Sequence, residues 1–375
     1  MKLVFFGDAI VEHLRRWTTF FARQGHEVHV ITWNLKVLDG YGDVHVHPMP
    51  KALSSSNALA RAVNLVSLTR RVRRLLRQIQ PDLIHAHSAG PYAWMGMVTR
   101  FRPFLITPWG SDVLIHVHDS LINHYFTVRA LRHADCVQAE GEDTREALLQ
   151  LGVDNRNIIV LPIGVDTARY RPGKPSADFL AAHGLAGGPV VVSTRTPTPV
   201  HDVDSTIHAA AIVLQKAPAV KFLIVGGGSE LPRLKDLGNS LGIGGALVFT
   251  DHVDEDEMAA CLQAADVCVS TSLSDSGTAA SIAEAMACGL PVVATDAGNV
   301  RERIHDGENG YVVPLRSPTA VAEKILHLLA NPEERRLAGQ RNRQLVEEQL
   351  DVRHVMKTVE SLYVDLCEKA TARRK

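Results

Sequence analysis

Two turns in the second half of the chain combine glycine and hydroxyl residues in the way that phosphate-binding turns do. Residues 225–230 read Val-Gly-Gly-Gly-Ser-Glu, between an apolar run and a helical pattern. Residues 270–278 read Ser-Thr-Ser-Leu-Ser-Asp-Ser-Gly-Thr and also precede a helical pattern. Glycine allows close backbone approach, and helix N-termini offer unpaired N–H groups and a positive dipole end. Both turns are candidate anion sites, and the alternative is a tight turn or a helix cap without a ligand.

Two charged residues could complete such a site. Arg195 follows an apolar run, so its guanidinium would stand at the carboxyl end of a strand and could neutralise a diphosphate. Glu284 lies about two turns into the helix expected after Thr278, where its carboxylate could accept hydrogen bonds from both hydroxyls of a ribose. The alternatives are a surface arginine and an exposed glutamate. The glycine turn is not a spaced GxGxxG fingerprint, and no Walker-type GKS or GKT occurs.

Three His-x-His pairs are candidate metal ligands, because alternate residues of a strand point to one face. They are His45 with His47, His85 with His87, and His116 with His118. No third ligand lies near any pair at a recognisable spacing. We therefore expect ordinary buried or surface histidines and no metal.

Composition excludes several classes of protein. The chain has 375 residues, 46% of them apolar, with 40 Lys and Arg against 41 Asp and Glu. The near-zero net charge argues against nucleic-acid binding, and the apolar content argues against disorder. No apolar run approaches the length of a transmembrane helix, and the first run is too short for a signal peptide. The scattered cysteines predict reduced thiols and a cytoplasmic location; they are Cys136, Cys261, Cys268, Cys288 and Cys367.

A cationic amphipathic helix is expected over residues 60–79, within the mildly basic first half of the chain. Its arginines could lie on an anionic membrane surface; they are Arg70, Arg71, Arg73, Arg74 and Arg77. The alternative is an ordinary solvated helix face that covers a sheet.

Short apolar runs alternate with helical patterns along the chain, which predicts an α/β protein with parallel sheets covered on both faces. Strands are expected at 3–6, 28–32, 83–85, 104–107, 136–139 and 158–161, and then at 190–193, 222–225, 246–250, 267–270, 292–295 and 311–313. Helices are expected at 10–24, 60–79, 120–132, 143–151, 203–217, 229–241, 255–264, 278–288 and 318–330, with a helical stretch over 332–372. A turn-rich segment near Pro162 separates the two series, so two doubly wound domains are predicted.

The sequences of several segments resemble those of one enzyme family. Residues 283–294, Ala-Glu-Ala-Met-Ala-Cys-Gly-Leu-Pro-Val-Val-Ala, resemble the signature of retaining nucleotide-sugar glycosyltransferases of family four, which have the GT-B fold. Five further segments match the family's usual sequence motifs in the same order; they are 25–28, 82–87, 162–166, 224–228 and 306–310. The resemblance covers essentially the whole chain.

This resemblance implies two Rossmann-like domains that face a central cleft, the first binding the acceptor and the second the nucleotide sugar. We place the domains at 1–165 and 166–345, with a helical segment, 346–375, that packs back on the first. By resemblance, Glu284 holds the ribose and Arg195 the diphosphate, while Gly227, Gly228 and the backbone near Val253 flank the base. The family transfers sugar with retention and without a metal, so no cofactor is expected.

The chain departs from the family pattern at several positions. Ser276 stands where the family has a first glutamate, with Asp275 one position away. Val200, followed by His201, stands in place of the usual lysine after the arginine. Asp8-Ala9 replaces a glycine pair in the first loop, and Trp109 replaces a histidine after the fourth N-terminal strand. Loss of the lysine removes one charge from the leaving-group site.

The expected function is transfer of a sugar from a nucleoside-diphosphate sugar to a hydroxyl acceptor, such as a glycan or a glycolipid. Candidate catalytic residues are Arg195, Asp275 and Ser276, and further donor contacts are expected at Gly227, Gly228, Glu230, Val253, Gly277, Thr278 and Glu284. Acceptor contacts are expected from Gly7, Asp8, His13, His87, Trp109 and Asp112, in loops after the N-terminal strands. The alternatives are a non-catalytic nucleotide- or glycan-binding protein, and an epimerase or phosphorylase on the same fold.

Overall fold

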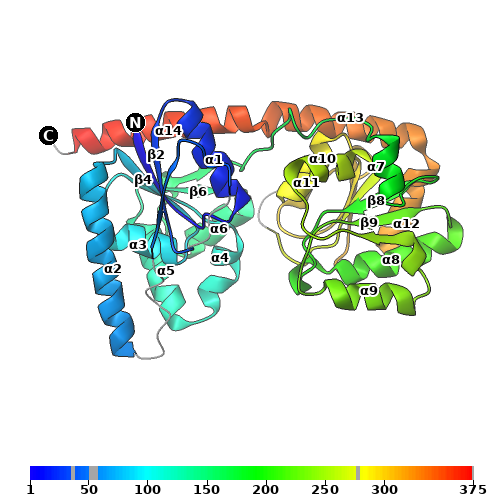
Figure 1. Ribbon diagram of the computed structural model, residues 1–375, viewed down its shortest axis with the longest axis horizontal. Coiled ribbons are helices and arrows are strands. Elements are labelled where there is room, and N and C mark those ends of the chain that lie inside the picture. The colour runs from blue at the N-terminus through cyan, green and yellow to red at the C-terminus, as the bar shows by residue number, and fades with distance from the viewer. Residues whose placement is uncertain (35–38, 50–57, 276–278, 374–375) are drawn as a thin grey trace. The chain divides into compact units, whose positions relative to one another are not determined.

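The computed structural model describes residues 1–375 except 35–38, 50–57, 276–278 and 374–375. The chain divides into two compact units, of which the first comprises 1–161 together with 356–375 and the second comprises 162–355. Each unit contains one parallel β-sheet with helices on both faces (Figure 1). The predicted α/β class and the pair of doubly wound sheets are therefore confirmed.

The sheet of the first unit has the strand order β3-β2-β1-β4-β5-β6-β7, and its strand pairs are parallel. Its strands are β1 (Lys2–Phe6), β2 (Glu27–Thr32), β3 (His45–Pro48), β4 (Leu83–His87), β5 (Phe104–Thr107), β6 (Cys136–Ala139) and β7 (Ile158–Val160). Its helices are α1 (Glu12–Arg23), α2 (Ala58–Ile79), α3 (Pro91–Thr99), α4 (Ser111–Leu114), α5 (Leu121–His133), α6 (Glu142–Gln150) and the part of α14 (Val352–Ala372) from Met356 onward.

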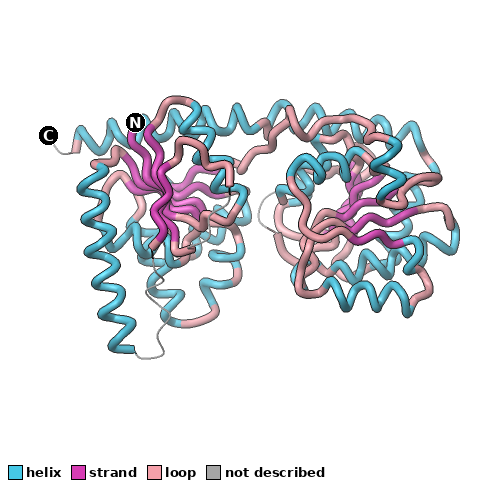
Figure 2. Tube along the Cα trace, viewed as in Figure 1, coloured by secondary structure: helices cyan, strands magenta, loops and turns pink. Residues whose placement is uncertain are grey.

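Alternation along β1 explains why this strand is apolar without interruption. Phe5 packs against Phe21 of α1 and Tyr363 of α14 on one face of the sheet. Val4 and Phe6 belong to the apolar cluster on the other face, which α2, α3 and α5 cover. Figure 2 shows helices on both sides of these strands. A strand buried on both faces needs apolar side chains at every position, and this is the pattern that made β1 predictable.

The second unit repeats this design with the strand order β10-β9-β8-β11-β12-β13. Its strands are β8 (Val190–Ser193), β9 (Lys221–Ile224), β10 (Leu247–Phe249), β11 (Val267–Ser270), β12 (Val292–Thr295) and β13 (Gly310–Val313). Its helices are α7 (Ala177–Ala182), α8 (Val203–Lys216), α9 (Leu231–Ser240), α10 (Glu255–Gln263), α11 (Ala280–Ala287), α12 (Pro318–Ala330) and α13 (Pro332–Gln349). One apolar cluster packs the sheet against α8, α9 and α12, and another packs it against α10, α11 and α13.

Four elements, β3, α3, α4 and α7, were absent from the sequence-based prediction, because none of them shows the periodic apolar pattern from which strands and helices were predicted. β3 is a sheet-edge strand with an exposed histidine, His45, a half-buried one, His47, and no apolar run. α3 is buried on several sides, including Gly96, so it has no amphipathic stripe. α4 has four residues and α7 has six, so each spans less than two helical turns. The predicted helix over 278–288 begins at Ala280, the one over 229–241 begins at Leu231, and the C-terminal helical stretch is divided between α13 and α14.

Among the described residues, no helix combines the length and the apolar character needed to cross a membrane.

Candidate active site

Arg195 lies two residues beyond β8 and is only 8% exposed. Its Nη2 is 2.5 Å from Oδ1 of Asp275, and its Nη1 donates to Oγ of Ser281 at 3.0 Å. Asp275 follows β11, the neighbour of β8 in the sheet, so the two loops meet at the carboxyl edge where doubly wound sheets bind ligands. The structure therefore brings together two of the predicted catalytic residues.

Ser281 and Glu284 both lie on α11, and Ser281 places the start of this helix against Arg195. They are three residues apart on the helix, so both side chains lie on one face. Glu284 is 8% exposed, and Ser281 contacts Arg195 directly. Because α11 begins at Ala280, Glu284 lies about one turn into the helix, closer to its N-terminus than the sequence suggested. The predicted contacts at Ser276, Gly277 and Thr278 lie outside the described residues.

Three buried polar atoms at or just beyond the carboxyl ends of β8 and β11 have no hydrogen-bond partner in the part of the chain that the structure describes. They are Nε of Arg195, Oγ of Ser193 at the end of β8, and Oγ of Ser272 just beyond β11. Buried polar groups in folded proteins nearly always have a partner. Because these atoms lie at the carboxyl edge of the sheet, they are candidate partners for a polar ligand.

His201 does not restore the charge of the lysine that the family usually has. It closes a short 3-10 helix, Pro199–His201, and its Nδ1 lies 2.6 Å from the carbonyl oxygen of Thr196. Burial lowers the pKa of His201, and the positive charge of Arg195 lowers it further. The imidazole is therefore mainly neutral at pH 7 and adds no second positive charge next to Arg195.

The glycine turn after β9 approaches the loop that carries Arg195. Gly226 has a φ of +116°, and a Cβ at Gly228 would lie 2.2 Å from the carbonyl oxygen of Pro197. No other residue type allows these two loops to pack so closely. Val253, in the loop after β10, is partly buried against the apolar core. Glu230 accepts a hydrogen bond from Arg233 at 2.7 Å, so its carboxylate already has a partner within the protein.

In the first unit, two predicted acceptor residues have unpaired ring nitrogens. His87, the last residue of β4, is 2% exposed, and its ring packs edge-on against Trp17 with 4.8 Å between centroids. Nε2 of His87 and Nδ1 of His13 are both buried without a hydrogen-bond partner among the described residues. Burial lowers the pKa of His87 to about 3 and that of His13 to about 4. Both rings are therefore neutral at physiological pH and can bind uncharged hydroxyl groups.

The other predicted acceptor residues shape the same edge of the first sheet. Gly7 follows β1, where a Cβ would meet Leu14 at 2.7 Å, and Asp8 accepts a hydrogen bond from the backbone N–H of Ile10 at 3.3 Å. Asp112 accepts from the backbone N–H of Trp109 at 3.0 Å and from that of Ala89 at 2.6 Å. Asp112 thus ties together the loops that follow β4 and β5.

The low pKa of His87 predicts a loss of stability in acid. Because the folded-state pKa lies below the ordinary value of about 6.5, the unfolded chain binds more protons, and stability falls as the pH drops below 6.5. Between pH 6.5 and pH 5 this one group should cost about 2 kcal/mol of unfolding free energy. Urea unfolding at pH 7 and pH 5 should show a smaller acid loss for His87→Asn than for wild type. Replacement of the exposed His116 by asparagine is the matched control, and an equal acid loss in all three proteins would contradict the prediction.

The His-x-His pairs do not assemble a metal centre. His85 is bound through Nδ1 to the hydroxyl of Tyr363 at 2.7 Å and through Nε2 to that of Thr107 at 2.8 Å. Nδ1 of His29 lies 3.0 Å from Nε2 of His47, within a stack of rings at the edge of the sheet. No group of three or more His, Cys, Asp or Glu side chains placed to hold a metal ion occurs among the residues described.

Comparison with protein-family profiles agrees with the division of the chain into two sheets. Residues 10–169 match the profile described as Glycosyltransferase Family 4, and residues 188–331 match the one described as Glycosyl transferases group 1. The chain belongs to glycosyltransferase family four. The family's two sequence regions thus fall on the two sheets, and Arg195, Asp275 and Glu284 lie in the second.

The similarity to relatives of known activity or structure extends over most of this glycosyltransferase. It is 24% identical to N-acetyl-alpha-D-glucosaminyl L-malate synthase of Bacillus anthracis, over 92% of this chain and 91% of the relative. It is 28% identical to a GDP-mannose-dependent alpha-(1-6)-phosphatidylinositol monomannoside mannosyltransferase of Mycolicibacterium smegmatis, over 70% and 71%. HepE of Anabaena, solved with UDP and glucose, superposes with a TM-score of 0.81 at 20% identity, covering 98% of this chain and 100% of HepE. The last likeness establishes the shared GT-B fold.

Ser281 contacts Arg195, and the sequence prediction did not identify it as a site residue. Its signal was present as a Ser-x-x-Glu spacing with Glu284, which is also the spacing of a helix capping box. Only the tertiary structure shows that its hydroxyl accepts from Arg195 rather than capping α11. The unpaired hydroxyls of Ser193 and Ser272 likewise become visible only when neighbouring strands are brought together.

Proposed function

We propose that this glycosyltransferase moves a sugar from a nucleoside-diphosphate sugar to a hydroxyl acceptor with retention of configuration at the anomeric carbon. The observation that carries the proposal is the buried Arg195, held at the carboxyl edge of the sheet by Asp275 and by Ser281, which lies three residues before Glu284 on α11. A fixed guanidinium at such an edge suits the charge that develops on a departing diphosphate.

In the proposed reaction, the bond between the anomeric carbon and the diphosphate oxygen breaks while the acceptor oxygen bonds to the same face of that carbon. The acceptor hydroxyl gives its proton to an oxygen of the departing phosphate, so atoms and charge balance without a protein base. Arg195 stabilises the negative charge that grows on the diphosphate, and the N-terminus of α11 adds its dipole. Asp275 orients Arg195 and can contact hydroxyls of the donor sugar.

For the donor, Glu284 would accept hydrogen bonds from the ribose hydroxyls, one helical turn from the diphosphate. The loops that contain Gly227, Gly228 and Val253 would flank the base, and the close approach of Gly228 to Pro197 leaves their backbone free of side-chain bulk. Ser276, Gly277 and Thr278 would complete the phosphate contacts. The complexes of HepE with UDP and the GDP-mannose dependence of the mycobacterial relative support a nucleoside-diphosphate sugar as the class of donor.

For the acceptor, we propose hydroxyl groups of a glycan or a lipid-linked sugar bound in the first unit. His13 and His87 each offer a neutral ring nitrogen without a partner among the described residues, and Trp17 provides an aromatic wall beside His87. Neutral imidazoles can donate to or accept from sugar hydroxyls without imposing a charge requirement. The names of two relatives refer to different compounds, L-malate in one and phosphatidylinositol monomannoside in the other, so they do not identify the acceptor of this chain.

We propose that the transfer needs no metal or other cofactor, because Arg195 and the start of α11 supply positive charge where a divalent cation would otherwise be required. We also propose a cytoplasmic enzyme, since all five cysteines are free thiols in the structure.

Contact with an anionic membrane face is proposed through α2. Arg70, Arg71, Arg73, Arg74 and Arg77 are all exposed on this helix, while Leu68, Val72 and Leu76 are buried in the core. Exposed cations are attracted to anionic headgroups at roughly 1 kcal/mol each near the surface. These arginines belong to the first unit, so the contact is separable from donor binding.

The test is a transfer assay with purified protein and a panel of UDP-, GDP- and ADP-sugars, with and without sugar acceptors and with a chelator present. We expect one donor class to be consumed, with the anomeric configuration retained in the product as read by proton NMR. Binding without turnover across the panel would instead indicate a non-catalytic protein. Product formation only with phosphate, or isomerised donor without acceptor, would indicate a phosphorylase or an epimerase.

A further inference from the structure

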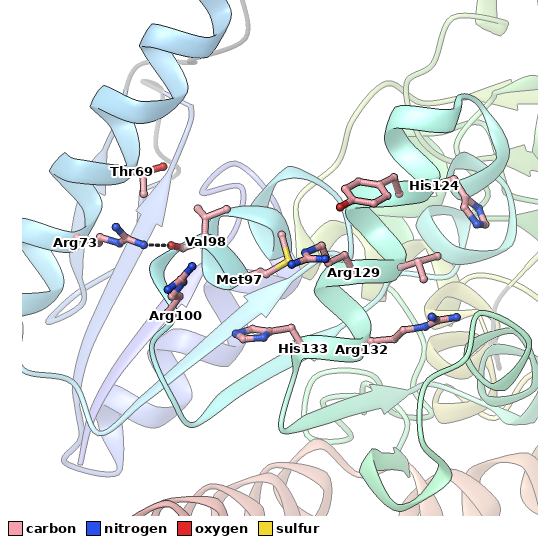
Figure 3. A pocket seen from close by; sticks show the side chains of 11 residues that line it. Thr69, Arg73, Met97, Val98, Arg100, His124, Arg129, Arg132 and His133 are labelled. Atoms are coloured by element: carbon pink, nitrogen blue, oxygen red, sulfur yellow. Dashed lines mark hydrogen bonds between the residues drawn. The ribbon is translucent and has the colours of Figure 1, made fainter.

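A cationic groove lies between α2, α3 and α5 in the first unit (Figure 3). It encloses about 810 Å³, and its walls include the apolar side chains of Met97, Val98 and Val128 with the ring of Tyr125. Every ionisable side chain that lines the groove is basic or is that tyrosine; the basic ones are Arg73, Arg100, Arg129, Arg132, His124 and His133. No carboxylate is among the described residues that line it. The groove therefore concentrates positive charge in a concave, partly apolar site.

Two of the arginines are held in place by backbone carbonyl groups. Nη2 of Arg73 donates to the carbonyl oxygen of Val98 at 2.5 Å, a contact drawn in Figure 3. Nε of Arg132 donates to the carbonyl oxygen of Leu151 at 3.0 Å. Each bond uses one of the five N–H groups of a guanidinium, so both side chains are positioned and keep donors for another partner.

The other two arginines lack a counter-charge. No ion pair or hydrogen bond joins the guanidinium groups of Arg100 and Arg129 to any residue that the structure describes, whereas the nearby Arg102 pairs with Asp135. Nε2 of His133 is also buried without a hydrogen-bond partner among the described residues. Burial lowers the pKa of His133, and the charges of Arg102, Arg129 and Arg100 lower it further, against the opposing effect of the Asp135 carboxylate. This crowding of like charges is unfavourable until an anion enters the groove.

The groove is distinct from the sites proposed for sugar transfer. Arg100 follows α3 and precedes β5, while His133 ends α5 just before β6, so both lie at the amino-terminal edge of the sheet. His87 ends β4 and therefore lies at the opposite, carboxyl edge. Interaction with helix dipoles accounts for cations in a last helical turn, as for Arg132 and His133. It does not account for Arg73 and Arg129, which come earlier in their helices.

We propose that this groove is a second ligand site, which binds the phosphate group of a phosphate-bearing molecule between Arg100 and Arg129. Arg73 and Arg132 flank the phosphate, and the wall formed by Val128 and Tyr125 takes the less polar part of the ligand. Such a phosphate can belong to a membrane lipid or to a soluble phosphate compound. Leu121 and Ile122, at the start of α5, are 89% and 67% exposed and would favour the lipid source. The proposal does not rest on the sugar-transfer reaction.

The experiment compares wild type with Arg100→Ala/Arg129→Ala in two assays. One assay is calorimetric titration with inorganic pyrophosphate, and the other is co-sedimentation with phosphatidylglycerol vesicles against phosphatidylcholine vesicles. Two controls keep the charge of the groove: Arg70→Ala/Arg74→Ala removes charge from the α2 face, and Arg195→Ala removes the diphosphate contact of the second unit. Because Arg100 and Arg129 are exposed, thermal unfolding should confirm that the double variant folds as wild type does.

We expect the groove variant to weaken binding by at least about tenfold in one or both assays, because two charge-assisted contacts are lost. Loss of pyrophosphate binding in the groove variant shows that the groove takes a soluble phosphate compound. Loss of vesicle binding alone identifies a lipid headgroup as the source of the phosphate. Unchanged binding in both assays overturns the proposal. Vesicle binding that depends on Arg70 and Arg74 but not on Arg100 and Arg129 also overturns it, while supporting the α2 membrane contact. Pyrophosphate binding that is lost only in Arg195→Ala overturns it too, and supports the donor site.

Discussion

Replacing Arg195 with alanine is expected to lower kcat/KM for the true donor by at least tenfold, with about 100-fold as the central expectation for the loss of one preorganised electrostatic contact. The guanidinium is buried and held at two points, by Asp275 and by Ser281, so it needs no reorganisation as charge develops on the diphosphate. Since that charge is largest in the transition state, most of the loss should appear in kcat.

Steady-state kinetics of purified variants measure this effect. Arg195→Lys keeps the charge but not the two-point geometry, so it should fall between wild type and the alanine variant. Arg301→Ala is the matched control, because Arg301 is an exposed arginine of the same unit and pairs with Asp296 at the surface. If Arg195→Ala folds as wild type does and turns over at the wild-type rate, Arg195 has no role in the reaction.

Replacing Glu284 with glutamine is expected to raise the Kd for the donor nucleotide by about tenfold to 100-fold, because hydrogen bonds to a charged acceptor contribute about 1.5–3 kcal/mol. A glutamine keeps the size of the side chain, which matters because Glu284 is 8% exposed within α11. The amide oxygen carries no formal charge and accepts more weakly from the two ribose hydroxyls.

A deoxyribose analogue of the nucleotide separates a ribose contact from a structural role. Wild type should discriminate strongly between the ribose and 2′-deoxyribose forms, and Glu284→Gln should discriminate much less, as measured by calorimetry. Glu323→Gln, an exposed substitution on α12, is the control for removal of one carboxylate from this unit. Equal discrimination by wild type and Glu284→Gln would remove Glu284 from the ribose site.

Strands were predictable where burial on both faces demanded an unbroken apolar run. β5, β6, β8, β11 and β12 have the predicted bounds, since each is a short apolar run closed by turns. β3 was missed because it is an edge strand that pairs only with β2. Its partly exposed positions accept histidines, so it lacks the unbroken apolar run of a central strand. α3 was missed because a helix buried on several sides loses the periodicity that identifies helices.

The position of a site residue was predictable where that residue closely follows a strand. The sequence predicted that Arg195 follows a strand at the carboxyl edge of a parallel sheet, and the structure places it there, in contact with Asp275. The contact of Arg195 with Ser281 and the proximity of His13 to His87 depend on helix packing, which spacing along the chain does not specify. The arginines of the cationic groove come from α2, from α5 and from the residue that follows α3, so no single segment of sequence reveals the groove.

Crystals of the protein grown with a nucleoside diphosphate, UDP or GDP, test the central claim most directly. The account predicts that the diphosphate lies within hydrogen-bond distance of the Arg195 guanidinium, that both ribose hydroxyls face the Glu284 carboxylate, and that Ser193 or Ser272 gains a polar partner. A nucleotide bound elsewhere, with Arg195 still directed only at Asp275 and Ser281, would contradict it.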